Sequence, residues 1–487
     1  MSSPYCASRS SSKCLALALL VSPLLALAQE RPPEEDVFGG SSSEQPAEQR
    51  LSGALSRTEN PLQIGGVLYL RSNLSAREGT PPSQWTLGAP SLTDVYLDAR
   101  PTDRVRGFVL GRMQFDPTQG SSVAGVGGVT LPGTTPASNP RVLLDQLWLR
   151  FDVERTAFLT IGRQHVKWGV GRFWNPTDYL HPVRRDPLAV FDERTGTFMA
   201  RVDMPWEARS WNFYGMAIFE PLATEAVSPA ATSVAGQVGG QGQVTSSATG
   251  TASQLGRLGA GARAEIVLGG WELGLDGVVQ RGIRPRFGID LSGAISEVDV
   301  RGELAIRTSS DVPVFEGPGP FSAATAAREP RGIRPMALAG AEWTHKYSDE
   351  DTYTFGLEYF YNANGYADAT LYPVLLLHNA YTPFYLGRHY AGAYFLLPKP
   401  GPWNLHTFTL SLIGNLSDQT GVARLDWSMT LLTYLTLEAY LQGHFGSSGG
   451  EFRFSLDVPP NAIPGLPGGV TVGPSTADLG LALRLNI

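Results

Sequence analysis

The sequence predicts an all-β protein, a closed antiparallel transmembrane β-barrel of about 18 strands, with 16 as the alternative count. Three observations predict it. Apolar residues recur with period two over most of the chain, and long and short connections alternate between the resulting segments. No stretch after residue 28 is long and apolar enough for a membrane-spanning helix. Only 17% of the residues are charged, against about 25% in ordinary soluble domains.

The first 28 residues are expected to be a secretory signal peptide. Arg9 and Lys13 precede the apolar run 15–27, and Ala26 and Ala28 form a small-residue cleavage site. An uncleaved anchor helix is the alternative, which so short a run disfavours. Both cysteines lie in this leader, at positions 6 and 14. The exported chain is therefore expected to lack disulfides, thiol catalysis and cysteine-ligated metals.

The next segment, 29–60, is acidic and rich in Pro, Ser and Gln. This composition predicts a disordered periplasmic lead-in, and the alternative is a short motif that docks a periplasmic partner. The barrel is then expected over 61–487, with long external loops and one loop, 166–196, folded into the lumen.

The period-two segments follow one another as short strands. In the clearest of them, Tyr353, Phe355 and Leu357 alternate with polar residues. The segment 287–292 is the shortest, and residues 452–456 could instead add a hairpin to the last loop. In order, strands are expected at 63–71, 92–100, 104–115, 142–152, 157–165, 197–204, 211–219, 257–268, 271–281, 287–292, 297–307, 335–347, 352–362, 388–397, 404–415, 421–432, 434–444 and 477–487.

The two faces of these segments differ in chemistry. One face is apolar, and the other carries full charges, as in 297–307 and 421–432. A soluble sandwich with so many such segments would be improbably large, whereas a membrane barrel puts the apolar face on lipid and the charged face in a wet lumen. Trp206, Trp211 and Trp271 stand beside short connections, which predicts an aromatic girdle at the periplasmic end.

The last segment alternates to the final residue, with Leu479, Leu481, Leu483, Leu485 and Ile487 on one face. It resembles the C-terminal signal by which the outer-membrane assembly machinery recognises barrels, although that signal usually ends in Phe or Trp.

A second resemblance rests on residues 162–172. Gly-Arg-Gln at 162–164 followed by Trp-Gly-Val-Gly-Arg at 168–172 is similar to a motif of alginate-export-type porins and related uncharacterised outer-membrane barrels. The segment 288–293 before Glu303 is similar to a second element of these proteins. The resemblance implies a porin in the outer membrane of a Gram-negative bacterium. By analogy with the arginine-rich lumen of the alginate exporter, it suggests that anions pass.

The loop 166–196 is rich in Arg, Trp and Gly, so it could narrow the pore and set its selectivity. Guanidinium groups match carboxylates and phosphates, and Trp stacks on sugar or aromatic faces. The alternative is a plug held by Arg–Asp pairs, without a role for solute. The residues expected to form the constriction are Lys167, Trp168, Arg172, Trp174, Asn175, Asp178, Arg184 and Arg185.

Charged residues at the polar positions of the strands are expected to line the lumen wall. Such interleaved charges are typical of a structural network, with a transport ladder as the alternative. The wall residues are Arg104, Arg106, Arg112, Arg150, Arg263, Arg301, Glu303, Glu358, Arg424 and Asp426.

The function expected is passive, partly selective passage of small hydrophilic solutes. The alternative is a plugged barrel that serves as a structural or export-complex component. No enzyme is expected, because Gly446-Ser-Ser-Gly-Gly matches a hydrolase motif only formally and no helix follows it. The expected partners are membrane lipid and lipopolysaccharide, the solute, the assembly machinery through the last strand, and two further copies if the barrel is a homotrimer rather than a monomer. No cofactor, metal or nucleic acid is implied.

Overall fold

The structure is a computed structural model. It describes residues 61–118, 125–126, 129–130, 139–181, 184–220, 222, 258–308, 314–320, 322, 324–378, 380–461 and 468–487. The expected leader and lead-in, 1–28 and 29–60, lie outside the described residues, as does most of the long connection 221–256.

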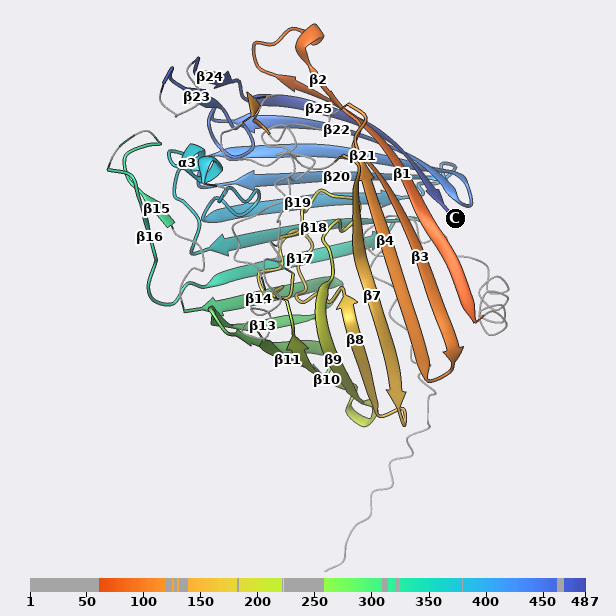
Figure 1. The fold of residues 1–487 in the computed structure, drawn as a ribbon. Coiled ribbons are helices and arrows are strands. Elements are labelled where there is room, and N and C mark those ends of the chain that lie inside the picture. The colour runs from red at the N-terminus through yellow and green to blue at the C-terminus, as the bar shows by residue number, and fades with distance from the viewer. Residues whose placement is uncertain are drawn as a thin grey trace, which may run out of the picture.

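Eighteen of the described strands close into one antiparallel barrel (Figure 1), because each pairs with the next and β25 pairs back with β1. Closure satisfies the backbone hydrogen bonds of every strand, which lipid cannot do. The barrel strands are β1 (Leu62–Arg77), β3 (Ser91–Thr102), β4 (Val105–Phe115), β7 (Arg141–Val153), β8 (Ala157–Gln164), β9 (Thr197–Trp206), β10 (Trp211–Ile218), β11 (Gly259–Leu268), β12 (Trp271–Gln280), β13 (Ile283–Ile295), β14 (Val298–Arg307), β17 (Met336–Lys346), β18 (Thr352–Asn362), β19 (His389–Pro398), β20 (His406–Asn415), β21 (Thr420–Leu432), β22 (Leu435–Gly446) and β25 (Ser475–Asn486).

The remaining elements belong to the connections. A nineteenth strand of the sheet, β2, adds to the end of β1. No helix within the described residues is long and apolar enough to cross a membrane. These elements are β2 (Thr86–Gly88), the hairpins β5 (Gly125–Val126) with β6 (Val129–Thr130), β15 (Val314–Glu316) with β16 (Ala326–Arg328) and β23 (Leu456–Val458) with β24 (Val470–Val472), the 3-10 turns η1 (Pro82–Gln84) and η2 (Glu207–Arg209), and α3 (Tyr372–Leu377).

The predicted strand count of 18 is confirmed, and the alternative of 16 is wrong. The shortest expected strand, 287–292, is the full-length β13, which pairs along its length with β12 and β14. The first strand is longer than expected, because its polar end pairs with both β25 and β2. The possible hairpin near the C-terminus forms as well. Its strands are β23 and β24, so of the expected residues 452–456 only Leu456 belongs to it.

The faces of the strands carry the chemistry that the alternation predicted. Leu291, Leu357 and Leu481 are 41%, 49% and 52% exposed on the outside, whereas the neighbouring Asp290 and Glu358 are 1% and 3% exposed on the inside. Trp206 and Trp211 meet beside one short turn, with ring centroids 5.5 Å apart. An apolar outer surface around a charged interior, with an even strand number, is the pattern of bacterial outer-membrane barrels. The chain is therefore a transmembrane barrel of this kind.

Three long connections fuse into a cap at the end of the barrel that lies away from the C-terminus (Figure 1). Phe315, Tyr372 and Phe454, one from each connection, share a buried apolar cluster. Below it the Glu451 carboxylate, 1% exposed, accepts hydrogen bonds from the Phe384 amide, the Tyr390 hydroxyl (2.6 Å) and the Asn415 amide (2.8 Å). This carboxyl joins the connections to the ends of β19 and β20.

A charge on the outer face should destabilise the barrel, and the same charge on the inner face should not. Leu291 and Ser292 are adjacent on β13 and point to opposite sides of the wall. We expect Leu291→Arg to lower the free energy of unfolding by about 2–4 kcal/mol, because arginine is costly in lipid. Ser292→Arg lies between Glu272 on β12 and Arg301 on β14, whose opposite charges offset each other, and should change it by less than about 1 kcal/mol. Reversible urea unfolding in lipid vesicles measures both, and equal effects would contradict the assignment of faces.

The cap should lose stability as the pH rises. Burial, with Asp418 beside it, raises the pKa of Glu451 from 4.5 to about 8. The folded chain therefore holds a proton that the unfolded chain releases above pH 4.5, and this contribution falls between about pH 5 and pH 8 by at most about 1.4 kcal/mol per pH unit. Thermal unfolding from pH 5 to 9 should show a weaker pH dependence in Glu451→Gln. The exposed turn variant Glu350→Gln serves as control, and a wild-type slope in Glu451→Gln would refute the assignment.

Candidate channel site

The connection between β8 and β9, residues 165–196, folds into the lumen, as the yellow trace inside the ring of strands in Figure 1 shows. We call it the lumen loop. It leaves the wall at β8, crosses to β14 and β18, and returns along β1 before it enters β9. It thereby contacts opposite sides of the barrel.

Two wall carboxylates hold the far end of the lumen loop through its backbone. Glu303 accepts the amides of Val170 and Gly171 at 2.6 and 2.7 Å, and it also accepts the Thr177 hydroxyl at 3.0 Å. Glu358 accepts the next two amides of the loop, those of residues 172 and 173, at 2.6 and 2.8 Å. Successive amides converge on each carboxylate, an arrangement that stabilises a buried anion. This part of the loop is therefore fixed to the wall through its backbone.

The glycines of the motif 168–172 make this contact possible. Gly169 has a left-handed φ of 94°, and a side chain there would meet the Glu303 carboxylate. At Gly171 an added Cβ would run into the Trp174 carbonyl. Gly169 is needed for its left-handed backbone and its approach to the carboxylate, and Gly171 is needed because the loop backbone folds back closely on itself at Trp174.

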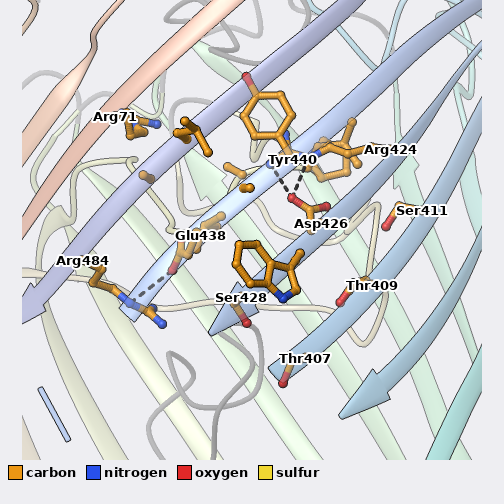
Figure 2. Close-up of a pocket in the computed structure, with 18 of the residues that line it drawn as sticks. Arg71, Thr407, Thr409, Ser411, Arg424, Asp426, Ser428, Glu438, Tyr440 and Arg484 are labelled. Carbon is orange, nitrogen blue, oxygen red and sulfur yellow. Dashed lines mark hydrogen bonds and ion pairs between the residues drawn. The ribbon is translucent and has the colours of Figure 1, made fainter. Parts of the chain in front are cut away.

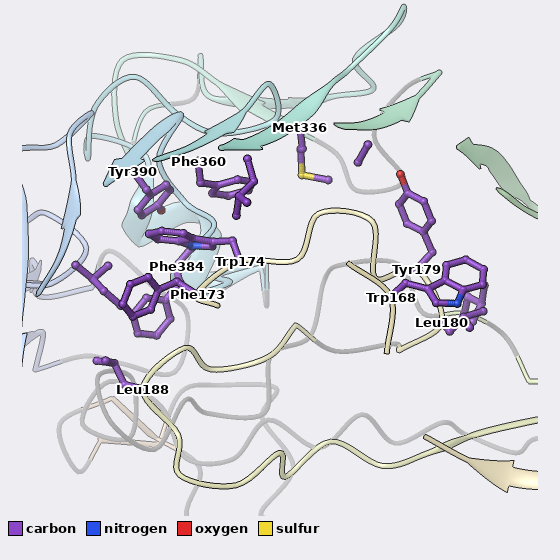
Figure 3. Close-up of a cluster of buried hydrophobic side chains, with 14 of the residues drawn as sticks. Trp168, Phe173, Trp174, Tyr179, Leu180, Leu188, Met336, Phe360, Phe384 and Tyr390 are labelled. Atoms are coloured by element: carbon purple, nitrogen blue, oxygen red, sulfur yellow. The ribbon is translucent and has the colours of Figure 1, made fainter. Parts of the chain in front are cut away.

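Apolar side chains of the lumen loop pack against the wall (Figure 3). The Trp174 ring is fully buried and stacks on Phe360 with centroids 5.5 Å apart, while its Nε1 donates to the Phe384 carbonyl at 3.0 Å. Trp168 is buried in the same cluster together with Tyr179. The sequence suggested that both tryptophans face solute. In the structure they anchor the loop, and their rings are covered by protein.

The middle of the lumen loop carries a buried ionic network. Asp178 binds the Arg194 guanidinium at 2.8 Å and His181 Nδ1 at 3.1 Å. Burial alone would raise the pKa of Asp178, but His181 and Arg194 hold it well below its usual range. Arg184 lies over the Tyr385 ring, 5.0 Å from its centroid, and donates to the Asn175 carbonyl at 3.4 Å. Lys167 is half-buried at the start of the loop.

The returning half of the lumen loop contacts β1, next to its seam with β25. The Phe191 ring meets the edge of Tyr69 at 4.8 Å, and Glu193 pairs with Arg71 at 2.9 Å. Arg484 on β25 lies over the same Phe191 ring. The loop is thus attached on both sides of the lumen.

A cavity that is partly open to solvent lies between the lumen loop and this side of the wall. Its wall is made by β1, β20, β21, β22 and β25, and its other side by residues 172–173, 185 and 187–190. Five arginines and two acids line it: Arg71, Arg172, Arg185, Arg424, Arg484, Asp426 and Glu438. The lining charge is therefore positive.

Figure 2 shows how these groups are arranged. Arg424 pairs with Asp426 at 2.7 Å, and Arg484 pairs with Glu438 at 3.3 Å. Thr407, Thr409 and Ser411, alternate residues of β20, present a row of hydroxyls beside the charged pair on β21, with Ser411 directly across from Arg424. The cavity thus offers guanidinium donors with neutral hydroxyls next to them.

Of the expected constriction residues, Arg172 and Arg185 line the cavity, and the other six do not. The Arg172 guanidinium lies 3.8 Å from the centroid of the Tyr394 ring. Asn175 and Asp178 are buried inside the loop.

The expected wall residues fall into four groups. Arg424 and Asp426 line the cavity, whereas Glu303 and Glu358 lie under the lumen loop. Arg104 is exposed in the turn after β3 and does not reach the wall. The others form wall contacts: Arg106 with Asp98 (2.9 Å), Arg112 with Asp94 (2.8 Å), Arg150 over Phe158 (4.5 Å), Arg263 with Asp290 (2.6 Å) and Arg301 with Glu358 (3.0 Å).

Sequence reasoning missed Arg71, Glu438 and Arg484 as site residues. The signal was present, because each alternates with lipid-facing leucines of its strand and so must face inward. What the pattern does not give is the position of the lumen loop, which decides which inward charges meet a cavity.

The formal hydrolase motif does not meet a histidine in the structure. His444 is engaged at both ring nitrogens, by Asp478 at 2.7 Å and by the Phe452 carbonyl at 2.6 Å. Ser448 instead lies 3.4 Å from the Ser455 hydroxyl.

No protein family model matches the chain, and no curated protein matches it in sequence. Solved structures similar in shape include Wzi of Escherichia coli, a carbohydrate-binding barrel involved in group 1 capsule assembly, with 12% identity, a TM-score of 0.46 and 90% and 87% of the two chains covered. OprB of Pseudomonas putida has 10% identity, a TM-score of 0.48 and coverage of 90% and 97%. OccAB4 of Acinetobacter baumannii has 7% identity, a TM-score of 0.48 and coverage of 88% and 98%.

Removing the Glu303 carboxylate should release the lumen loop. In Glu303→Ala the amides of Val170 and Gly171 and the Thr177 hydroxyl lose their acceptor, which we expect to cost about 2–4 kcal/mol. The folded variant should become susceptible to trypsin at Lys167, Arg184 or Arg185 while the strands stay protected. Glu350→Ala, in an exposed turn, is the control. A loop that stays as resistant as in the wild type would show that Glu303 does not hold it.

Proposed function

We propose that this barrel is a passive outer-membrane channel for small hydrophilic solutes, and that it favours anionic ones. The observation that carries the proposal is the cavity beside the lumen loop, with its five arginines and two acids. A solute that passes the barrel on this side meets these groups within a confined, partly desolvated space. Charge acts more strongly there than in bulk water.

The chemistry of the cavity fits small oxyanions and hydroxylated compounds. Guanidinium groups donate in pairs to carboxylate and phosphate oxygens. The hydroxyls of Thr407, Thr409 and Ser411 can exchange hydrogen bonds with water or with solute hydroxyls as the solute moves. Because Arg424 and Arg484 already have carboxylate partners, a passing anion is held weakly and can leave again, as conduction requires.

Planar-bilayer recording of the refolded barrel tests the channel. We expect steady conductance and a reversal potential on the anion-selective side in a KCl gradient. In the double variant Arg172→Gln, Arg185→Gln the anion-to-cation permeability ratio should fall at least about fivefold, since each lost charge at about 4 Å in water contributes ~1 kcal/mol. Arg328 is an exposed residue of the β15–β16 hairpin, and Arg328→Gln should leave the ratio unchanged.

Two outcomes would overturn the proposal. Cation selectivity in the wild type would show that the lining arginines do not set the ionic preference. A folded barrel that does not conduct would mean a closed lumen, and the chain would then be better explained as a structural or export-complex component.

A further inference from the structure

Two histidines of the lumen loop form a chain of contacts between two carboxylates. His165 Nε2 lies 2.8 Å from Asp145 Oδ1 on β7, and His165 Nδ1 lies 3.3 Å from His181 Nε2. His181 Nδ1 lies 3.1 Å from Asp178 Oδ1. This row of contacts joins the first residue of the loop, the middle of the loop and the wall. The cavity lies elsewhere in the lumen and includes none of these four residues.

Counting hydrogens fixes the charge of the two histidines in this row of contacts. An ionised carboxylate only accepts, so the nitrogens facing Asp145 and Asp178 must both carry hydrogen. The contact between the two rings needs one hydrogen as well. Three hydrogens on two imidazoles are one more than two neutral rings carry. All three hydrogen bonds therefore form only when the His165–His181 pair carries a single positive charge.

Two or four hydrogens on the two rings, instead of three, would each break one of the three hydrogen bonds. If the pair loses its extra proton, one nitrogen faces an acceptor without hydrogen. If it gains a fourth, two N–H groups oppose each other between two imidazolium rings. The fully bonded state therefore exists only between these two proton counts.

Charged neighbours surround the pair on every side. Arg112 on β4, itself bound to Asp94 of β3, lies behind Asp145 at 3.3 Å. Within the loop, Arg194 binds both Asp178 and Asp192. Other titratable groups that act on this cluster are Arg163 of β8 through Asp145, Glu193 of the loop through Arg112, Asp276 of β12 and Tyr385 of the cap. The carboxylates favour the extra proton, and the two guanidinium groups keep them ionised.

We propose that His165 and His181 share one extra proton and form a pH-sensitive latch, which holds the lumen loop to β7 most tightly at intermediate pH. The latch would control the width of the passage, and this consequence rests on the proposed channel function. The latch itself is a property of the loop. Burial lowers the pKa of His181, and Arg194 adds to this, so the alkaline release begins close to the ordinary histidine range of about 6.5 or below it.

The lack of cysteine in the chain after residue 14 allows a direct test of the latch. A single reporter, Leu180→Cys, lies next to His181 at a fully buried position and reacts with a thiol reagent only when the loop opens. Its labelling rate is divided by that of Ser348→Cys, in an exposed turn, which corrects for the reagent's own pH dependence. We expect a minimum at intermediate pH, with a rise of up to about tenfold per pH unit on each side, the limit for one linked proton.

In the same reporter background, His181→Gln and His165→Gln should each flatten this profile between about pH 5 and 8, because glutamine keeps an amide donor and acceptor but does not titrate. His345→Gln, beside Trp343 near the opposite end of the barrel, should keep the wild-type profile. A minimum that survives in both glutamine variants, or that His345→Gln removes, would overturn the latch.

Recording conductance over the same pH range separates the two proposals. A pH-dependent labelling profile without conductance would retain the latch and reject the channel. Conductance together with a flat wild-type labelling profile would reject the latch and retain the channel.

Discussion

The structure depends on one constraint, namely that every backbone amide and carbonyl within the membrane must find a partner in the chain itself. The β1–β25 pairing meets it by closing the sheet, with contacts from Val67 to Arg77. Because alternate residues of a closed sheet face inward, closure also brings the charged side chains together in the interior. A wide barrel cannot fill that interior with strand side chains alone, and the lumen loop occupies a part of the space that remains, with the cavity beside it.

The interior is therefore organised by carboxylates that serve different tasks. Glu303 and Glu358 hold the backbone of the loop, whereas Asp426 and Glu438 neutralise cavity arginines. All four occupy inward positions of their strands, and their sequence contexts are alike. What distinguishes them is whether the loop covers them. A mutation of the loop motif would thus change the environment of wall residues more than a hundred positions away in sequence.

The sequence predicted the wall almost completely, because lipid on one side and water on the other impose a strict period of two. Even β13, the least regular segment, was found. The site was predicted only in part. The loop was singled out by its arginines, tryptophans and glycines, but Trp168 and Trp174 are anchors, because large aromatic rings gain more from burial than from exposure to a wet lumen. Which inward residues line the cavity depends on the path of one loop, and no local pattern specifies that path.

The seam between the two ends of the chain has a consequence for biogenesis. Tyr69 and Arg71 come from β1, Ala482 and Arg484 come from β25, and Tyr69 hydrogen-bonds Glu438 across 369 positions at 2.8 Å. The lining of the cavity is consequently incomplete in any insertion intermediate whose first and last strands have not met. A slip of one residue in their register would turn the inward side chains of one of the two strands toward lipid, so correct closure and a complete cavity lining are the same event.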